Sequence, residues 1–123
     1  LYDNNIDVTN GNAKTSGKYS QAVQYTIDTK KKTIKQTWSY GKSLGKDNFT
    51  RVIGSAQRLS NGNTLIDFGY KHDGSQSNII EVDKNNNQVF NLTISSSKTD
   101  RTYVYRAYRV KFTPSNFVFD ATK

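Results

Sequence analysis

Residues 19–45 read YSQAVQYTIDTKKKTIKQTWSYGKSLG, and this stretch decides the fold that we predict. Alternate positions along 19–28 and again along 33–40 are apolar or aromatic, except for one glutamine in each run, Gln21 and Gln36. This period of two is typical of a β-strand with one buried face. The polar, lysine-rich residues 28–33 between the two runs suit a turn. The sequence therefore predicts a β-hairpin over residues 19–41.

Further short strands, separated by turn residues, are expected along the rest of the chain. Asn61-Gly62 is the clearest turn signal, because this pair readily adopts positive φ, and it predicts a tight hairpin. The expected strands cover residues 1–5, 49–59, 64–70, 79–83, 88–94 and 103–112, with polar loops over 6–18, 71–78 and 95–102. The small residues Gly54, Ser55 and Ala56 indicate a crowded interior along the strand 49–59.

An internal repeat relates the two halves of the chain. Tyr25–Asp28 followed by Ile34 matches Ile80–Asp83 followed by Val89, and Leu1–Asp3 matches Leu65–Asp67. A repeating four-stranded unit of roughly 50 residues is typical of a β-propeller blade. We therefore predict an all-β fold of antiparallel four-stranded blades, about two in this chain. The expected division is a partial blade over 1–41, a full blade over 49–96 with residues 51–59 as its inner strand, an extra inner-type strand over 103–112 and a tail over 113–123.

Composition and charge exclude several classes of function. The chain of 123 residues holds no cysteine, so it has neither disulfides nor a thiolate nucleophile or metal ligand. No apolar run approaches the roughly 20 residues of a membrane span. The net charge of +8 favours anionic partners, but no aromatic-flanked basic motif of a nucleic-acid-binding type occurs. The carboxylates follow no metal-loop spacing, so no metal site is expected.

Residues 19–45 also resemble a known family, the bacterial arylsulfate sulfotransferases. Members of that family carry a segment of the type Tyr-Ser-Arg-x-Val-Glu-Tyr-x-Ile-Asp, a short turn, and then Val-x-Gln-Val-Trp-Glu-Tyr-Gly-Lys. The matching positions are Tyr19, Ser20, Val23, Tyr25, Ile27, Asp28, Gln36, Trp38, Tyr40, Gly41 and Lys42. Gln21 and Gln24 depart from the family pattern, which has arginine and glutamate there.

The resemblance implies a fold and an activity for a longer protein. The fold is a six-bladed propeller with an N-terminal β-sandwich. The activity is transfer of a sulfuryl group from an aryl sulfate to a phenolic acceptor, with no nucleotide cofactor. The implied nucleophile is a histidine on an inner strand just before the segment that matches Leu1–Asn5. Because the chain starts after that strand and holds no methionine, we expect it to be a C-terminal piece without catalytic residues, and inactive alone. The resemblance also implies an exported protein, periplasmic, extracellular or on the cell surface.

Two groups remain as candidate site residues. Tyr105-Arg106-Ala107 resembles the Tyr-Arg-Ala near the C-terminus of the family. Arg106, beside Tyr105, could face the central channel and bind a sulfate oxygen. Alternatively, Arg106 is paired on a strand surface and Tyr105 packs in the sheet. His72, the single histidine, precedes Asp73-Gly74 in a loop and is expected to be an ordinary surface residue.

The sequence leaves a second function and a pairing hypothesis open. The alternative to an enzyme is a non-catalytic propeller module that binds acidic glycans through its basic surface. The missing inner strand of the partial blade leaves an open edge, which invites another strand. We expect residues 103–112 to pair with Leu1–Asn5, within the chain or in a strand-swapped homodimer, giving two packed four-stranded sheets with Val104 facing inward.

Overall fold

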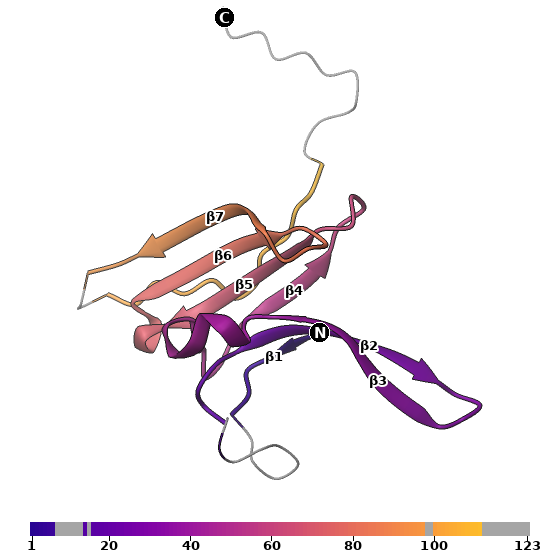
Figure 1. Ribbon diagram of the computed structural model, residues 1–123. Helices are drawn as coiled ribbons and strands as arrows, with labels where there is room; N and C mark the ends of the chain where they lie inside the picture. Colours follow the sequence, from indigo (N-terminus) through magenta and orange to yellow (C-terminus); the bar gives the residue numbers. More distant parts are fainter. Residues whose placement is uncertain (7–13, 15, 98–99, 112–123) are drawn as a thin grey trace, which may run out of the picture.

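The computed structural model describes residues 1–6, 14, 16–97 and 100–111, and these form two antiparallel β-sheets (Figure 1). Sheet A has the strand order β1-β2-β3, and sheet B has the order β4-β5-β6-β7. The strands are β1 (Tyr2–Asp3), β2 (Gln21–Asp28), β3 (Thr33–Tyr40), β4 (Ser55–Arg58), β5 (Thr64–Lys71), β6 (Gln76–Val82) and β7 (Gln88–Ser95). Two short 3-10 helices, η1 (Lys42–Asn48) and η2 (His72–Gly74), follow β3 and β5. The all-β prediction is confirmed.

The predicted hairpin in sheet A is confirmed as β2 and β3. Asp28 pairs with Thr33 at the turn, and its carboxylate accepts hydrogen bonds from the amides of Lys30 and Lys31 at 3.0 and 2.9 Å. The hairpin projects beyond sheet B (Figure 1), so Ile27 and Ile34, which pair near its tip, are 66% and 64% exposed. Only the base of the hairpin is therefore buried.

Sheet B is a meander whose two predicted hairpins are also confirmed. At the first turn the amide of Asn63 donates to the side chain of Asn61 at 3.0 Å, and Gly62 takes the positive φ that the turn needs. At the second turn the Asp83 carboxylate accepts the amides of Asn85 and Asn87 at 2.8 and 2.9 Å. Side chains of Asn and Asp thus close both turns.

The strand expected over residues 49–59 is shorter than predicted, because β4 begins only at Ser55. Ile53 and Gly54 have φ values of 64° and 151°, which are incompatible with an extended strand. Gly54 is also pressed against the ring of Tyr2, and a Cβ at that position would collide with it. This confirms the crowding that the small residues indicate. β6, in contrast, begins earlier than expected, at Gln76.

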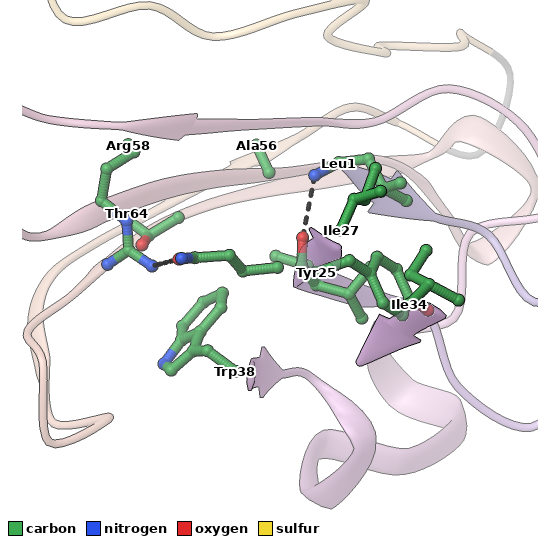
Figure 2. Close-up of a pocket in the computed structure, with 11 residues that line it drawn as sticks. Leu1, Tyr25, Ile27, Ile34, Trp38, Ala56, Arg58 and Thr64 are labelled. Atoms are coloured by element: carbon green, nitrogen blue, oxygen red, sulfur yellow. Dashed lines mark hydrogen bonds between the residues drawn. The ribbon is translucent and has the colours of Figure 1, made fainter. Parts of the chain in front are cut away.

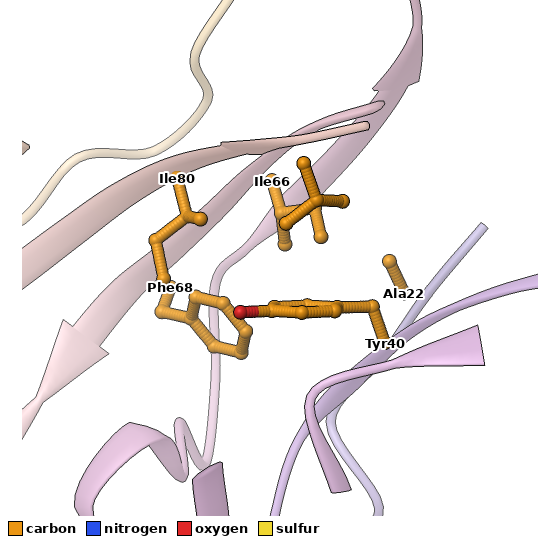
Figure 3. Close-up of a cluster of buried hydrophobic side chains, with 6 residues drawn as sticks. Ala22, Tyr40, Ile66, Phe68 and Ile80 are labelled. Atoms are coloured by element: carbon orange, nitrogen blue, oxygen red, sulfur yellow. The ribbon is translucent and has the colours of Figure 1, made fainter. Parts of the chain in front are cut away.

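The hydrophobic core lies between the two sheets (Figure 3). Tyr40, at the base of the hairpin, lies over Phe68 and Ile66 of β5, and its hydroxyl accepts a hydrogen bond from Gln88 at 2.8 Å. Tyr2 of β1 meets the ring of Phe68 edge-on at 5.7 Å. The buried core residues are Ala22, Tyr40, Ile66, Phe68, Ile80 and Val82. One face of sheet B is therefore covered by sheet A.

Residues 100–111, which we call the strap, cross the other face of sheet B. The amide of Val104 donates to the Gly69 carbonyl and to the Ser77 hydroxyl, each at 3.1 Å. Further along, the Ala107 amide donates to Ser55 Oγ at 3.3 Å. Ser55 alternates along β4 with Ala56, which packs against the core, so the strap and sheet A lie on opposite faces.

The strap corrects the strand expected over residues 103–112. Residues 103–111 form no strand, because their amides bond to isolated carbonyls and side-chain oxygens and not to a neighbouring ladder. The expected pairing of this segment with Leu1–Asn5 within the chain is therefore wrong, and sheet A has three strands, not four. The prediction that the Val104 face points inward is wrong for most of the segment, because Val104 is half-buried but Arg106, Tyr108 and Val110 are exposed. Phe112 and the tail 113–123 lie outside the described residues, and exchange of the segment between two copies stays a prediction.

Candidate functional site

Arg106 lies on the outer surface of the strap, between two tyrosines. Its guanidinium donates a hydrogen bond to the hydroxyl of Tyr108 at 2.7 Å. It also lies 5.7 Å from the ring centre of Tyr108 and 5.9 Å from that of Tyr105, within the range of cation–π attraction. The hydrogen bond with Tyr108 raises the pKa of the Arg106 guanidinium further above its usual value. Arg106 is thus a permanent cation with a defined position, open to solvent.

The sheet beneath the strap fixes this position on both sides of Arg106. Ala107 is bound to Ser55, and the Arg109 amide donates to the side chain of Gln57 at 3.0 Å. The Arg109 guanidinium then forms an ion pair of 2.8 Å with Glu81, a carboxylate that is only 2% exposed. Because the Glu81 carboxylate pairs with Arg109, it does not neutralise Arg106. The positive charge of Arg106 therefore remains available to a ligand.

A small pocket of about 270 Å³ opens beside Arg106, and we call it the junction pocket because β1, β4 and the strap meet there. Its lining includes Tyr2, Gly54, Ser55, Gln57, Arg106 and Tyr108. One cation, two phenol rings and a serine hydroxyl surround this space. Such a set suits a small anion that carries a ring, because the guanidinium pairs with the anion and the rings pack against the ligand.

A buried polar network holds the Tyr2 wall of the junction pocket. The hydroxyls of Tyr2 and Thr50 are 2.6 Å apart. Asn4 donates to the Thr50 carbonyl at 2.9 Å, and the Thr50 amide donates to Ser20 Oγ at 2.9 Å. Burial raises the pKa of the Tyr2 phenol well above its usual value, so Tyr2 stays neutral at ordinary pH. The network therefore joins β1, the start of β2 and the segment before β4.

Asp67 of β5 lies buried under the strap, and none of the described cationic side chains forms an ion pair with it. It is fully buried, and neither of its carboxyl oxygens has a hydrogen-bond partner in the described part of the chain. Burial raises the pKa of Asp67 to about 7. A carboxyl group with this pKa takes up and releases a proton near neutral pH.

The two predicted site residues, Arg106 and Tyr105, lie in different environments. Arg106 lines the junction pocket, whereas Tyr105 is 71% exposed and only flanks the guanidinium. Of the alternative, the part in which Tyr105 packs in the sheet is therefore wrong, whereas Arg106 is indeed paired at the surface, with Tyr108. His72 is exposed, as expected, and lies 3.4 Å from the carboxylate of Asp47. Tyr2 and Tyr108 were not predicted as site residues, although the aromatic residue two positions after Arg106 was a readable signal for Tyr108.

A larger, more apolar groove of about 560 Å³ lies between the β2–β3 hairpin and β4 (Figure 2). The Arg58 guanidinium stacks on the indole of Trp38 at 4.9 Å and donates to the side chain of Gln24 at 2.8 Å. Tyr25 and Ile34 form the opposite end of the groove (Figure 2). These contacts tie the hairpin to sheet B, and the Trp38 indole N–H adds a bond of 2.8 Å to Asn86.

Among the residues that the structure describes, no three histidine or acidic side chains gather closely enough to hold a metal ion. None of the described helices is both long and apolar enough to cross a membrane.

Comparison with known proteins assigns the chain to a family. Residues 1–106 match the family model described as Arylsulfotransferase (ASST). The chain belongs to the arylsulfotransferase family. Arylsulfate sulfotransferase AssT of Escherichia coli O6:H1 (strain CFT073) is 33% identical to it over 101 residues, which cover 76% of this chain and 17% of AssT. The chain thus spans less than a fifth of the length of this arylsulfotransferase relative, and the resemblance seen in residues 19–45 is confirmed.

The arylsulfotransferase match includes most of the candidate site. Tyr2 and Gly54 lie within the matched region, and Arg106 is its last residue. Tyr108, which fixes the guanidinium of Arg106, lies two positions beyond it. The cation of the junction pocket is therefore part of the arylsulfotransferase region of this chain.

Proposed function

We propose that this chain is part of an arylsulfate sulfotransferase, and that Arg106 binds a sulfate oxygen of the substrate. The observation that carries the proposal is the exposed guanidinium, held by Tyr108 at 2.7 Å at the junction pocket, in a chain that belongs to the arylsulfotransferase family. A guanidinium binds the oxygens of a sulfate ester in a fork of N–H donors. The rings of Tyr105 and Tyr108 offer flat apolar surfaces to the aryl group.

The proposed fold of the whole protein is a β-propeller. The order β4-β5-β6-β7 is that of a complete four-stranded blade, with β4 as the inner strand. β1, β2 and β3 correspond to the second, third and outer strands of the preceding blade. In this arrangement the junction pocket lies at the inner-strand side of both sheets, where β4 and the free edge of β1 meet.

The proposed reaction proceeds in two steps through a histidine outside this chain. In the first step the histidine nitrogen bonds to sulfur while the bond from sulfur to the aryl oxygen breaks, and the phenolate leaves and takes up a proton. In the second step the oxygen of a phenolic acceptor, having lost its proton, attacks sulfur and the S–N bond breaks. The part of this chain is electrostatic, since Arg106 faces the oxygens on which negative charge is distributed.

The proposal is tested by assaying the whole protein that contains this chain, with 4-nitrophenyl sulfate as donor and phenol as acceptor. We expect turnover, and we expect R106Q to lower kcat/KM about 10²-fold, because one charged donor is lost. R101Q is the matched control, since Arg101 is an exposed cation on the same strap. Equal effects of R101Q and R106Q would show that Arg106 has no specific role, and absence of turnover would contradict the enzyme assignment and favour the glycan-binding module.

Two further expectations belong to the same proposal. The isolated chain is expected to show no turnover, because the histidine nucleophile comes from outside it. Transfer by the isolated chain that disappears in H72A would place the active site at His72 instead. We also propose that the protein is exported, and a parent sequence without any export signal would contradict this.

A further inference from the structure

The free edges of the two sheets differ in how they are protected. A free edge presents unpaired N–H and C=O groups, and proteins protect it with charged residues, short strands or a covering segment. β1 is only two residues long and ends at Asp3, and β3 carries Lys35. β4 is only four residues long, and the strap is bound to its Ser55 and Gln57. β7 has none of these protections within the part of the chain that the structure describes.

β7 is long, apolar and free of charge. Its eight residues, QVFNLTIS, include neither a charged residue, nor proline, nor glycine. Within the described residues β7 pairs with β6 alone. Val89, Phe90 and Leu92 are 55%, 43% and 42% exposed. A β-bulge in the β6–β7 pairing distorts the start of the strand near Val89, so residues 90–95 form its regular part.

The regular part of β7 is complementary to itself. Phe90, Leu92 and Ile94 pair with Glu81, Ile79 and Ser77 of β6, so they share one face of the sheet. In an antiparallel pair of two such strands, a two-fold axis through Leu92 sets Leu92 opposite Leu92 and Phe90 opposite Ile94. Asn91 then lies opposite Thr93 on the other face. Each strand thus offers the apolar and polar side chains that its copy needs.

Charge also favours a second copy at this edge. The chain has a net charge of +8, so most of its surface repels another copy. β7 itself adds no charge, and a copy can approach it without placing like charges side by side. We propose that β7 is a homodimerisation edge, at which two copies join their β7 strands antiparallel into one continuous eight-stranded sheet. A strand of this length buries little area, so the association is expected to be weak and dependent on concentration.

Cysteine cross-linking tests the proposed register. Because the chain contains no cysteine, each single-cysteine variant carries one reactive thiol. Under mild oxidation L92C is expected to give a disulfide-linked dimer, since two opposed residues lie within disulfide range. I27C is the control, because Ile27 is an equally apolar, exposed strand residue on sheet A. Equal cross-linking of both variants, or none in L92C, would overturn the proposal.

Sedimentation velocity over about 1–500 μM gives a second readout without cross-linking. The wild-type chain is expected to shift from monomer to dimer, L92K to remain monomeric, and I34K on the free edge strand β3 to behave as wild type. Both substitutions replace exposed residues, so neither removes core packing. Three outcomes would show that β7 is not the dimer contact. They are a wild-type chain that stays monomeric, a dimer that persists in L92K, and a dimer that is lost in I34K alone.

Discussion

At the scale of single residues, the unusual groups of this chain lie where the strap meets sheet B. Glu81 and Asp67 are both buried there, but among the described residues only Glu81 has a cation, Arg109, at 2.8 Å. The sequence showed that these acids lie in strands, but it could not show which face they occupy or that residues 100–111 bury them. A buried acid without a counter-ion is uncommon, because its ionised form loses hydration without compensation.

Asp67 makes the stability of the chain depend on pH. Its pKa, about 7, is raised above the unfolded value of about 4, so the folded state holds the extra proton between these two values. The contribution of Asp67 is therefore greatest below pH 4 and is lost as the pH rises through 7. D67N, which cannot ionise, is expected to remove this dependence. Urea unfolding of both proteins between pH 4 and 8 measures it, and equal pH profiles would contradict it.

At the scale of elements, the strands were predictable and the strap was not. Alternation and the Asn and Asp turns identify β2, β3 and the hairpins of sheet B from nearby residues alone. Residues 103–111 alternate as well, but their partners are a carbonyl and hydroxyls far away in the sequence, such as Gly69 and Ser55. Local patterning cannot report such contacts, so it favoured a strand.

The strap can be released by one substitution in β5. G69A is expected to displace it, because the new methyl group would collide with the Val104 carbonyl oxygen. The φ of Gly69 is not in the left-handed region, so alanine suits the strand backbone itself. S77A, which removes the hydroxyl that accepts the Val104 amide at 3.1 Å, is expected to have a milder effect.

Hydrogen exchange distinguishes strap release from general unfolding. The Val104 and Ala107 amides are expected to exchange faster in G69A, while the β5–β6 ladder amides keep their protection. In the whole protein the same variant is expected to lower binding of the aryl sulfate, because Arg106 loses its position. Uniform loss of protection across sheet B would show that Gly69 supports the sheet and not the strap.

At the scale of the whole molecule, the two sheets are joined by a small core and by Trp38. The indole stacks with Arg58 of β4 and bonds to Asn86 of the β6–β7 turn, so one side chain spans both sheets. The sequence marked Trp38 as a family position, but its partners are known only from the fold. The propeller, too, was inferred from a repeat and a resemblance.

Removing this link is expected to weaken the joint between the sheets. W38A should lower the free energy of unfolding by about 1–3 kcal/mol, from lost aromatic packing and the cation–π contact. R58K keeps the charge but stacks less well, so a smaller loss of under about 1 kcal/mol is expected. Urea unfolding followed by circular dichroism measures both. A W38A protein as stable as wild type would show that Trp38 does not contribute to joining the sheets.

The order of strands in each sheet is the same as their order along the chain. Every strand pair in both sheets is therefore made between neighbours in sequence, which shortens the loops that must close during folding. Each hairpin can form as soon as its second strand leaves the ribosome, before the rest of the chain exists. The strap follows both sheets in the chain, so Asp67 and Glu81 remain hydrated until residues 100–111 have been made. Synthesis itself thus delays the burial of the two acids until Arg109 can pair with one of them.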